Sequence, residues 1–129
     1  CIFRAPLMIG TDLPQLDDFN LSLLTNEEII AMNKCPNQAR QLSPSLSGEK
    51  IVAWYNYIGL GEDGQNHAYY AFFNITDEDQ PLTFNAKAAV MDDGTAPAKP
   101  VIRDLWEHKD LGDSVKMILP PHSCKAFRV

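Results

Sequence analysis

The sequence has few of the positive charges that a polyanion would need. It contains 11 Lys and Arg against 17 Asp and Glu, a formal net charge of -6. Because neutralising phosphates requires a surplus of cations, this balance argues against nucleic acid and acidic membrane surfaces as partners. Long apolar runs are missing as well, and none approaches the roughly 20 residues of a membrane span. We therefore expect no nucleic-acid partner and no membrane partner.

Cysteine is also sparse. Cys1, Cys35 and Cys124 make an odd count, and no two of them have the short spacing of a zinc site or a redox motif. We expect three free thiols, no metal and no cofactor. The N-terminus lacks an initiator Met, a basic segment and a signal-peptide core. A chain that opens on Cys1 in mid-pattern predicts a piece of a longer protein.

The length excludes one large class of enzyme. The chain has 129 residues, of which 45% are hydrophobic and 22% charged, a composition typical of a single globular domain. A complete (β/α)₈ barrel needs about 250 residues. Such a barrel therefore cannot be whole within this sequence.

The first 33 residues have the pattern of the end of an α/β unit. Residues 6–10 (PLMIG) form a short apolar run, typical of a strand buried on both faces of a parallel sheet. Residues 25–28 (TNEE) match a capping box, so a short helix should run through Ile29 and Met32. Another helix is predicted just before it by apolar residues at helical spacing, namely Leu16, Phe19, Leu23 and Leu24.

Beyond residue 33 the pattern changes to short strands. Residues 33–50 are polar and contain three Pro or Gly breaks, which marks a candidate domain boundary. Short strands separated by turn residues predict an antiparallel β-sandwich over residues 34–129. Residues 67–75 carry bulky apolar groups on both faces and should lie at the centre of a sheet. The strands are expected at 51–57, 67–75, 82–85, 101–106, 114–119 and 124–129.

Residues that could carry chemistry are scattered. The acidic ones lie in helix starts or turns, where Asp is usually solvated and bonded to the local backbone. Neither of the acidic turns at 77–79 and 92–93 has the ligand spacing of a calcium loop. His67, His108 and His122 fall in three different predicted turns. The residue pattern thus identifies no catalytic group and no metal site.

Aromatic residues in the predicted strands allow two interpretations. They could form a sugar-stacking platform, although Trp and Tyr within a sandwich are more often core. The residues are Trp54, Tyr55, Tyr57, Tyr69, Tyr70 and Trp106. Asn20 and Asn74 also fit the glycosylation pattern, but Asn74 lies in a strand that should be buried.

Four segments resemble a known family. Residues 5–13 (APLMIGTDL) and 21–33 (LSLLTNEEIIAMN) resemble the end of the catalytic barrel in glycoside hydrolase family 27, the α-galactosidases and α-N-acetylgalactosaminidases. Residues 103–111 (RDLWEHKDL) and 121–127 (PHSCKAF) resemble the last strands of the C-terminal β-domain in the same family. The segments lie near the two ends of the chain, in the family's order.

This resemblance implies a fold in two unequal parts. Residues 1–33 would be the remnant of the final β/α unit of a (β/α)₈ barrel. Residues 34–129 would form the C-terminal, Greek-key-like antiparallel β-sandwich. The family hydrolyses glycosides with retention, using an Asp nucleophile and an Asp acid/base on earlier barrel strands, so no catalytic residue is expected in this chain. In one departure, Asn33-Lys-Cys35 stands where the family commonly has an Asn-Gln-Asp-like segment.

The resemblance also implies a role. Thr11 and Asp12 follow the last barrel strand, where they would line the edge of the substrate site or brace it. The chain would be the non-catalytic C-terminal part of an α-galactosidase-like enzyme whose partners are the missing barrel portion and an α-galactoside-type carbohydrate. The parent would be secreted or periplasmic. Specificity for galactose or N-acetylgalactosamine, and homo-oligomer formation, stay open.

Two alternatives belong to other classes. One is a free-standing β-sandwich module that binds carbohydrate through Trp54 or Trp106. The other is a purely structural module that covers one side of a barrel. Under the family interpretation, residues 6–10 and the predicted helix face that follows would be left uncovered when the chain is alone.

Overall fold

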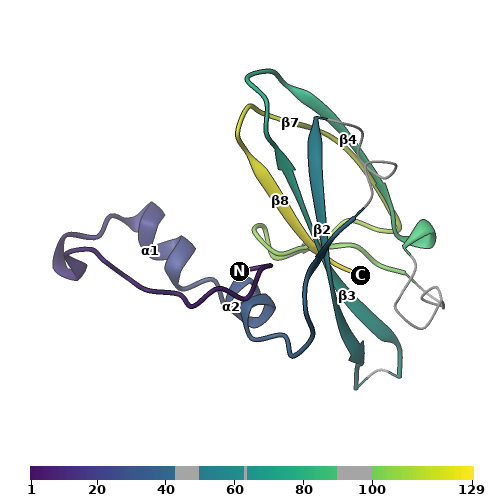
Figure 1. Ribbon diagram of the computed structural model, residues 1–129, viewed down its shortest axis with the longest axis horizontal. Helices are drawn as coiled ribbons and strands as arrows, with labels where there is room; N and C mark the ends of the chain where they lie inside the picture. Colours follow the sequence, from purple (N-terminus) through teal and green to yellow (C-terminus); the bar gives the residue numbers. More distant parts are fainter. Residues whose placement is uncertain (43–49, 63, 90–99) are drawn as a thin grey trace.

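Two antiparallel β-sheets form most of the molecule, and an N-terminal arm, residues 1–33, carries the two α-helices (Figure 1). A 3₁₀ turn, η3 (Ala86–Ala88), follows β4. The computed structural model describes residues 1–42, 50–62, 64–89 and 100–129. The larger sheet has six strands in the order β1-β2-β3-β8-β5-β6, and the smaller sheet pairs β4 with β7. The strands are β1 (Arg40–Gln41), β2 (Ile51–Leu60), β3 (Asn66–Asn74), β4 (Gln80–Asn85), β5 (Arg103–Asp104), β6 (Lys109–Asp110), β7 (Ser114–Leu119) and β8 (Cys124–Arg128).

An aromatic core lies between the two sheets. Phe84 of β4 packs against rings of the larger sheet, with centroid distances of 4.9 Å to Tyr70, 5.1 Å to Phe72 and 6.0 Å to Phe127. Side chains alternate between the faces of a strand, so every second residue of β3 reaches this core. The predicted antiparallel β-sandwich is confirmed.

The outer face of the larger sheet is buried too. Tyr69 and Ala71 of β3 point away from the aromatic core and pack with Ile29 and Met32 of helix α2 (Glu27–Asn33). This explains why β3 is apolar on both faces, and its predicted central position is confirmed. The strand predicted at residues 114–119 is confirmed as β7, with Val115 and Leu119 buried and the polar residue between them exposed.

The strand predicted at residues 101–106 is shorter than expected. Only Arg103–Asp104 is extended, and the chain then turns back to form β6. The carboxylate of Asp104 accepts hydrogen bonds from the backbone N–H of Trp106 at 2.9 Å and of Glu107 at 3.2 Å. These bonds replace a strand ladder with a turn, which His108 completes in a left-handed conformation with φ of 53°.

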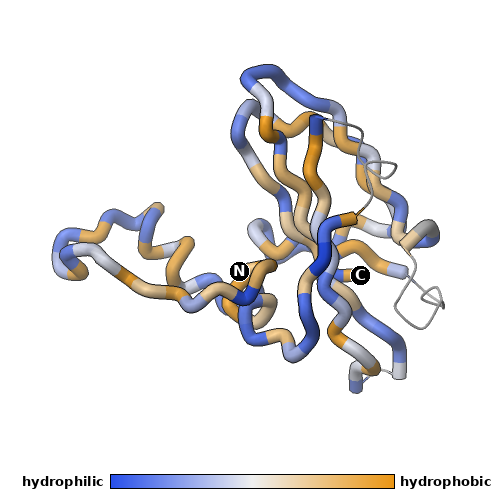
Figure 2. The backbone as a smooth tube through the Cα atoms, viewed as in Figure 1, coloured by the Kyte–Doolittle hydropathy of each residue, from blue (hydrophilic) through white to orange (hydrophobic). Residues whose placement is uncertain are grey.

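The arm contains a 3₁₀ turn, η1 (Leu13–Gln15), and helix α1 (Asp18–Leu24), and it extends away from the sheets (Figure 1). The strand predicted at residues 6–10 does not form, because a strand needs a ladder partner and no segment of the described chain pairs with it. No residue from 3 to 25 is buried. Hydrophobic segments run along the arm (Figure 2), and its exposed apolar side chains include Leu7, Met8, Ile9, Leu13, Phe19, Leu21 and Leu24.

The start of α2 differs by one residue from the predicted capping box. Asn26, not Thr25, is the N-cap, and its side-chain oxygen accepts a hydrogen bond from the N–H of Ile29 at 3.0 Å. Thr25 instead ends α1, where its hydroxyl donates to the carbonyl of Leu21 at 2.8 Å. The reason lies outside the helix: the amide of Asn26 also donates to the carbonyl of Leu105 at 2.9 Å.

Candidate functional site

Thr11 and Asp12 lie on the arm and are exposed. Asp12 immediately precedes η1, and its carboxylate accepts a hydrogen bond from the side-chain amide of Gln15 at 2.9 Å. This contact spans three residues and holds the local turn. The predicted role of Thr11 and Asp12 at the edge of a substrate site stays a prediction.

The most elaborate polar site in the described part of the chain joins α2 to the sandwich. Glu28 of α2 receives two hydrogen bonds from Arg103 of β5, from Nε at 2.8 Å and from Nη2 at 2.7 Å. Nη1 of the same guanidinium donates to Asp110 of β6 at 3.1 Å. His108 places Nδ1 2.7 Å from Oε1 of Glu28. Two residues of the β5–β6 hairpin, Arg103 and His108, thus contact α2, and Asp110 holds Arg103.

Electrostatics reinforce this arrangement. The hydrogen bond from Arg103 lowers the pKa of Glu28, and His108 adds to the effect while partial burial opposes it. Hydrogen bonds to Glu28 and Asp110 raise the pKa of Arg103. Glu28 is therefore held as a carboxylate, in the bidentate geometry that guanidinium and carboxylate favour.

A second ion pair, between β8 and β5, supports the hairpin. Asp104 is 1% exposed, and its carboxylate accepts a hydrogen bond from Nζ of Lys125 at 2.8 Å. Lys125 also donates to Glu107 at 2.7 Å. Burial by itself would lower the pKa of Lys125, but the two carboxylates outweigh it and raise this pKa. The turn after β5 is thus anchored to β8.

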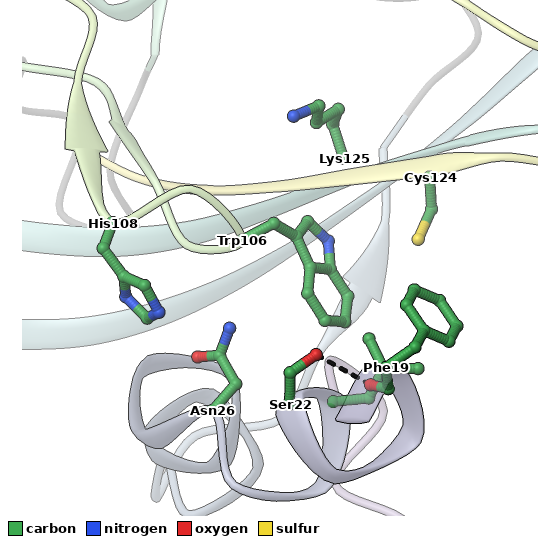
Figure 3. A pocket seen from close by; sticks show the side chains of 8 residues that line it. Phe19, Ser22, Asn26, Trp106, His108, Cys124 and Lys125 are labelled. Atoms are coloured by element: carbon green, nitrogen blue, oxygen red, sulfur yellow. Dashed lines mark hydrogen bonds between the residues drawn. The ribbon is translucent and has the colours of Figure 1, made fainter. Parts of the chain in front are cut away.

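The contact between α2 and the β5–β6 hairpin, made by Glu28, Arg103 and His108, is called the joint. A cavity of about 540 Å³ next to the joint separates α1 from the sandwich. Figure 3 shows Trp106 above Ser22 and Phe19, with His108 and Cys124 on its two sides. The hydroxyl of Ser22 donates to the backbone carbonyl of Phe19, within its own helix, at 2.7 Å. Helix α1 buries no residue against the sandwich.

The six aromatic residues of the predicted platform are divided between the two faces of the larger sheet. Tyr55 and Tyr70 belong to the core between the sheets, and Tyr69 is buried on the outer face. Trp54 and Trp106 are half-buried against α2 and the N-terminus, and Trp54 meets Phe3 edge-on at 4.4 Å. These residues pack as core, so they do not form the flat exposed surface that a sugar would stack on.

Other predicted candidates stay apart in the structure. His67 approaches the carbonyl of Val129 at 3.2 Å, and His122 contacts Asp77 at 2.8 Å. The acidic turn at residues 92–93 lies outside the described residues. Asn74 is 2% exposed, and its amide donates to three backbone carbonyls, so its predicted burial is confirmed.

Metal-ligating groups do not gather within the described segments. Among residues 1–42, 50–62, 64–89 and 100–129, no three His, Cys, Asp or Glu side chains are grouped so that they could hold a metal ion. The helices in those same segments are too short or too polar to span a bilayer.

The three cysteines are free thiols, as the sequence predicts. Cys35 is buried beneath α2, with its sulfur 3.3 Å from the side-chain oxygen of Asn56 and 3.3 Å from the carbonyl of Tyr57. The departure from the family at residues 33–35 therefore places a small apolar side chain in the α2 cluster. Burial raises the pKa of the Cys124 thiol, while Lys125 and the N-terminal ammonium oppose it.

Sequence reasoning did not identify the joint between α2 and the hairpin. The sequence pattern places Glu28 only in a capping box, and Arg103 and Asp104 only in a predicted strand and in the family resemblance. One signal was available: residues 103–111 combine both charge signs with Trp106 in a segment too polar for a central strand. Such a segment needs a polar partner when it lies against a sheet.

Comparison with known proteins places this geometry in a family. The model of the alpha galactosidase C-terminal beta sandwich domain matches residues 42–129. Alpha-galactosidase 3 of Arabidopsis thaliana is 25% identical over 98% of this chain, and the alpha-galactosidase of Cyamopsis tetragonoloba is 24% identical over 96% of it. The chain spans 28% and 29% of these two relatives.

A solved structure gives the same result. A GH27 β-L-arabinopyranosidase from Geobacillus stearothermophilus, with arabinose bound, superimposes with a TM-score of 0.73 and 32% identity, over 98% of this chain and 27% of that one. The resemblance to glycoside hydrolase family 27 is thus confirmed, and a free-standing carbohydrate-binding module is not favoured. The chain belongs to the family of α-galactosidase C-terminal β-sandwich domains.

Proposed function

We propose that this chain is the C-terminal part of a family 27 α-galactosidase-like glycoside hydrolase. Residues 34–129 form the sandwich that packs on the catalytic barrel and supports it, and residues 1–33 supply the last β/α unit of that barrel. The parent enzyme hydrolyses a terminal α-linked galactose or N-acetylgalactosamine with retention of configuration. This chain by itself is not catalytic.

The arm is the single observation that carries this proposal. Its apolar side chains have no cover in the described structure, and its residues 6–10 have the composition of a buried strand without a ladder partner. Exposed apolar patches of this kind mark surfaces that bind another protein surface. The surrounding strands and helices of a barrel are the cover that fits such a strand and helix.

The extent of the matches supports the same assignment. The family model begins at residue 42, whereas the plant relatives align over 98% and 96% of the chain. The arm is therefore shared with proteins more than three times as long as this chain. In the assembled enzyme Thr11 and Asp12 would then lie at the edge of the substrate site.

An activity assay tests the non-catalytic role. The purified chain should show no turnover of aryl α-galactoside, aryl α-N-acetylgalactosaminide or aryl β-L-arabinopyranoside. Turnover comparable with that of a full-length relative would mean that the chain holds a catalytic carboxylate pair, and it would overturn the proposal.

A complementation assay tests the structural role. The barrel of a family 27 relative, truncated before its last β/α unit, should be inactive alone and should gain activity when this chain is added. Leu7→Asp in the arm should prevent the gain, because a charge would enter the barrel interface. The matched control is Ile118→Asp on the exposed face of β7, which should leave complementation intact.

A further inference from the structure

Helix α2 differs from the rest of the arm in that it is held by the sandwich through both apolar and polar contacts. Its apolar side places Ile29 and Met32 in the cluster on the outer face of the larger sheet. Its polar side presents Asn26 and Glu28 to the β5–β6 hairpin. A surface that combines a buried apolar patch with matched polar groups has the features of a specific interface.

The residues of this interface are far apart in the sequence. Asn26 and Leu105 are separated by 79 positions, and Glu28 and Arg103 by 75. Helix propensity therefore does not produce these contacts. They depend on the docking of α2 onto the folded sandwich.

Arg103 is also held by contacts within the sandwich that do not involve α2. One amino group of its guanidinium already bonds to Asp110 on the neighbouring strand, and the backbone of β5 pairs with β6 and β8. The two remaining donor directions point at the two oxygens of Glu28. A guanidinium that is already held in one orientation loses little conformational entropy when it binds a carboxylate. It therefore favours a carboxylate in the matching position.

Two ion pairs elsewhere in the described residues are much more exposed. The side chains of Lys50 and Glu78 are 59% and 75% exposed, and those of Lys87 and Asp113 are 66% and 46% exposed. Arg103 and Glu28 are 27% and 25% exposed. Exposed pairs contribute little to stability. The Lys125–Asp104 pair is more buried, but it joins two strands of the sandwich, whereas the Glu28–Arg103 pair joins α2 to the sandwich.

We propose that α2 is the segment by which the sandwich recognises the barrel, and that Arg103 is the residue that positions it. The partner that fits this surface is thus an amphipathic helix with a buried Ile and Met three positions apart and a carboxylate directly before the Ile. The identity of that helix as part of a barrel rests on the proposed function. The clamp of Glu28 by Arg103 rests on the contacts alone.

Residue-resolved hydrogen exchange on the whole chain tests the clamp. Arg103→Ala should accelerate exchange of the α2 amides at Ile30 to Asn33 by about tenfold or more, while β3 keeps its protection. Arg103→Lys should give an intermediate effect, because an ammonium cannot bridge both carboxylate oxygens and Asp110 together. Lys87→Ala, at an exposed pair on the sandwich, is the matched control and should leave α2 unchanged.

The outcomes separate the clamp from a general structural effect. Equal loss of protection in α2 and β3 would mean that Arg103 only stabilises the sandwich, and unchanged protection of α2 would mean that the ion pair positions nothing; either overturns the proposal. If the clamp behaves as expected while the chain itself hydrolyses an aryl glycoside, the proposed function fails and the clamp stands.

Discussion

The two helices of the arm have the same length and the same kind of start, yet only one is integrated into the fold. Each has seven residues and a side-chain N-cap: Asp17 accepts a hydrogen bond from the N–H of Asn20 at 2.7 Å, and Asn26 accepts one from the N–H of Ile29 at 3.0 Å. Helix α1 buries no residue, whereas α2 buries Ile29 and Met32.

This difference shows what a cap can and cannot do. A helix of seven residues is too short to be stable in water on its own, so its stability comes from packing. Helix α2 has that packing within the chain. Helix α1 has apolar residues but a cavity where a packing partner would be, and in the proposed assembly that partner is the barrel.

The contacts of α2 also cross the boundary predicted at residues 33 and 34. Composition places the change between Asn33 and Lys34, because the polar segment begins there. The side chains of α2 nevertheless pack on the sandwich. A domain boundary drawn from composition therefore need not follow the contacts, and the division at 33 and 34 stays a prediction.

The largest expected effect distinguishes a buried residue of α2 from an exposed residue of α1. Ile29→Ala should destabilise the chain by about 2–4 kcal/mol, because it removes buried methyl groups and leaves a cavity. Leu21→Ala in α1 should change stability by less than about 0.5 kcal/mol, because Leu21 is exposed. Urea unfolding followed by tryptophan fluorescence measures both. Equal losses would show that α1 is packed as firmly as α2.

The next effect distinguishes the two caps. Asn26→Ala should cost about 1–3 kcal/mol, since it removes the N-cap and leaves the carbonyl of Leu105 without this partner. Asp17→Ala removes a comparable cap from α1 and should lower stability by less than about 0.5 kcal/mol, because the cap is exposed and α1 is not coupled to the core. A large loss from Asp17→Ala would contradict that separation.

The smallest effect is the response to acid at the joint. Glu28 faces Arg103 and His108 of the hairpin, Arg103 also bonds to Asp110, and the pKa of Glu28 is lowered in the folded chain. A group with a lowered folded pKa contributes stability above its unfolded pKa and loses it as the pH falls through the folded value. Stability should therefore fall below about pH 4.5, the ordinary value for Glu. Glu28→Gln should flatten part of that fall, and an unchanged acid profile would contradict the prediction.

Much of the fold could be predicted from local pattern. The apolar faces of β3, the alternation of β7 and the Gly-rich hairpin between β2 and β3 follow from side-chain periodicity and turn chemistry. The strand order could not, because it depends on pairings between distant segments, such as β8 between β3 and β5. A local pattern carries no information about which strands become neighbours.

The joint could not be predicted from the sequence for a related reason. Thr25 and Asn26 are both good N-caps, and a carbonyl 79 positions away decides between them. Residues 6–10 have the composition of a buried strand, but the ladder partners that would make them one are not in the described chain. The family resemblance supplied the barrel context that neither residue periodicity nor the chain's own contacts provide.

Hydrogen exchange along the arm measures most directly whether it is built for a partner. In the monomeric chain, the amides of residues 5–24 should exchange close to the rate of an unfolded peptide, while those of β3 and of the second half of α2 are protected. Addition of a truncated family 27 barrel should protect residues 5–24 and change β3 little. Protection of residues 5–10 equal to that of β3 in the monomer, with no change on adding the barrel, would contradict the assignment of the arm to a barrel.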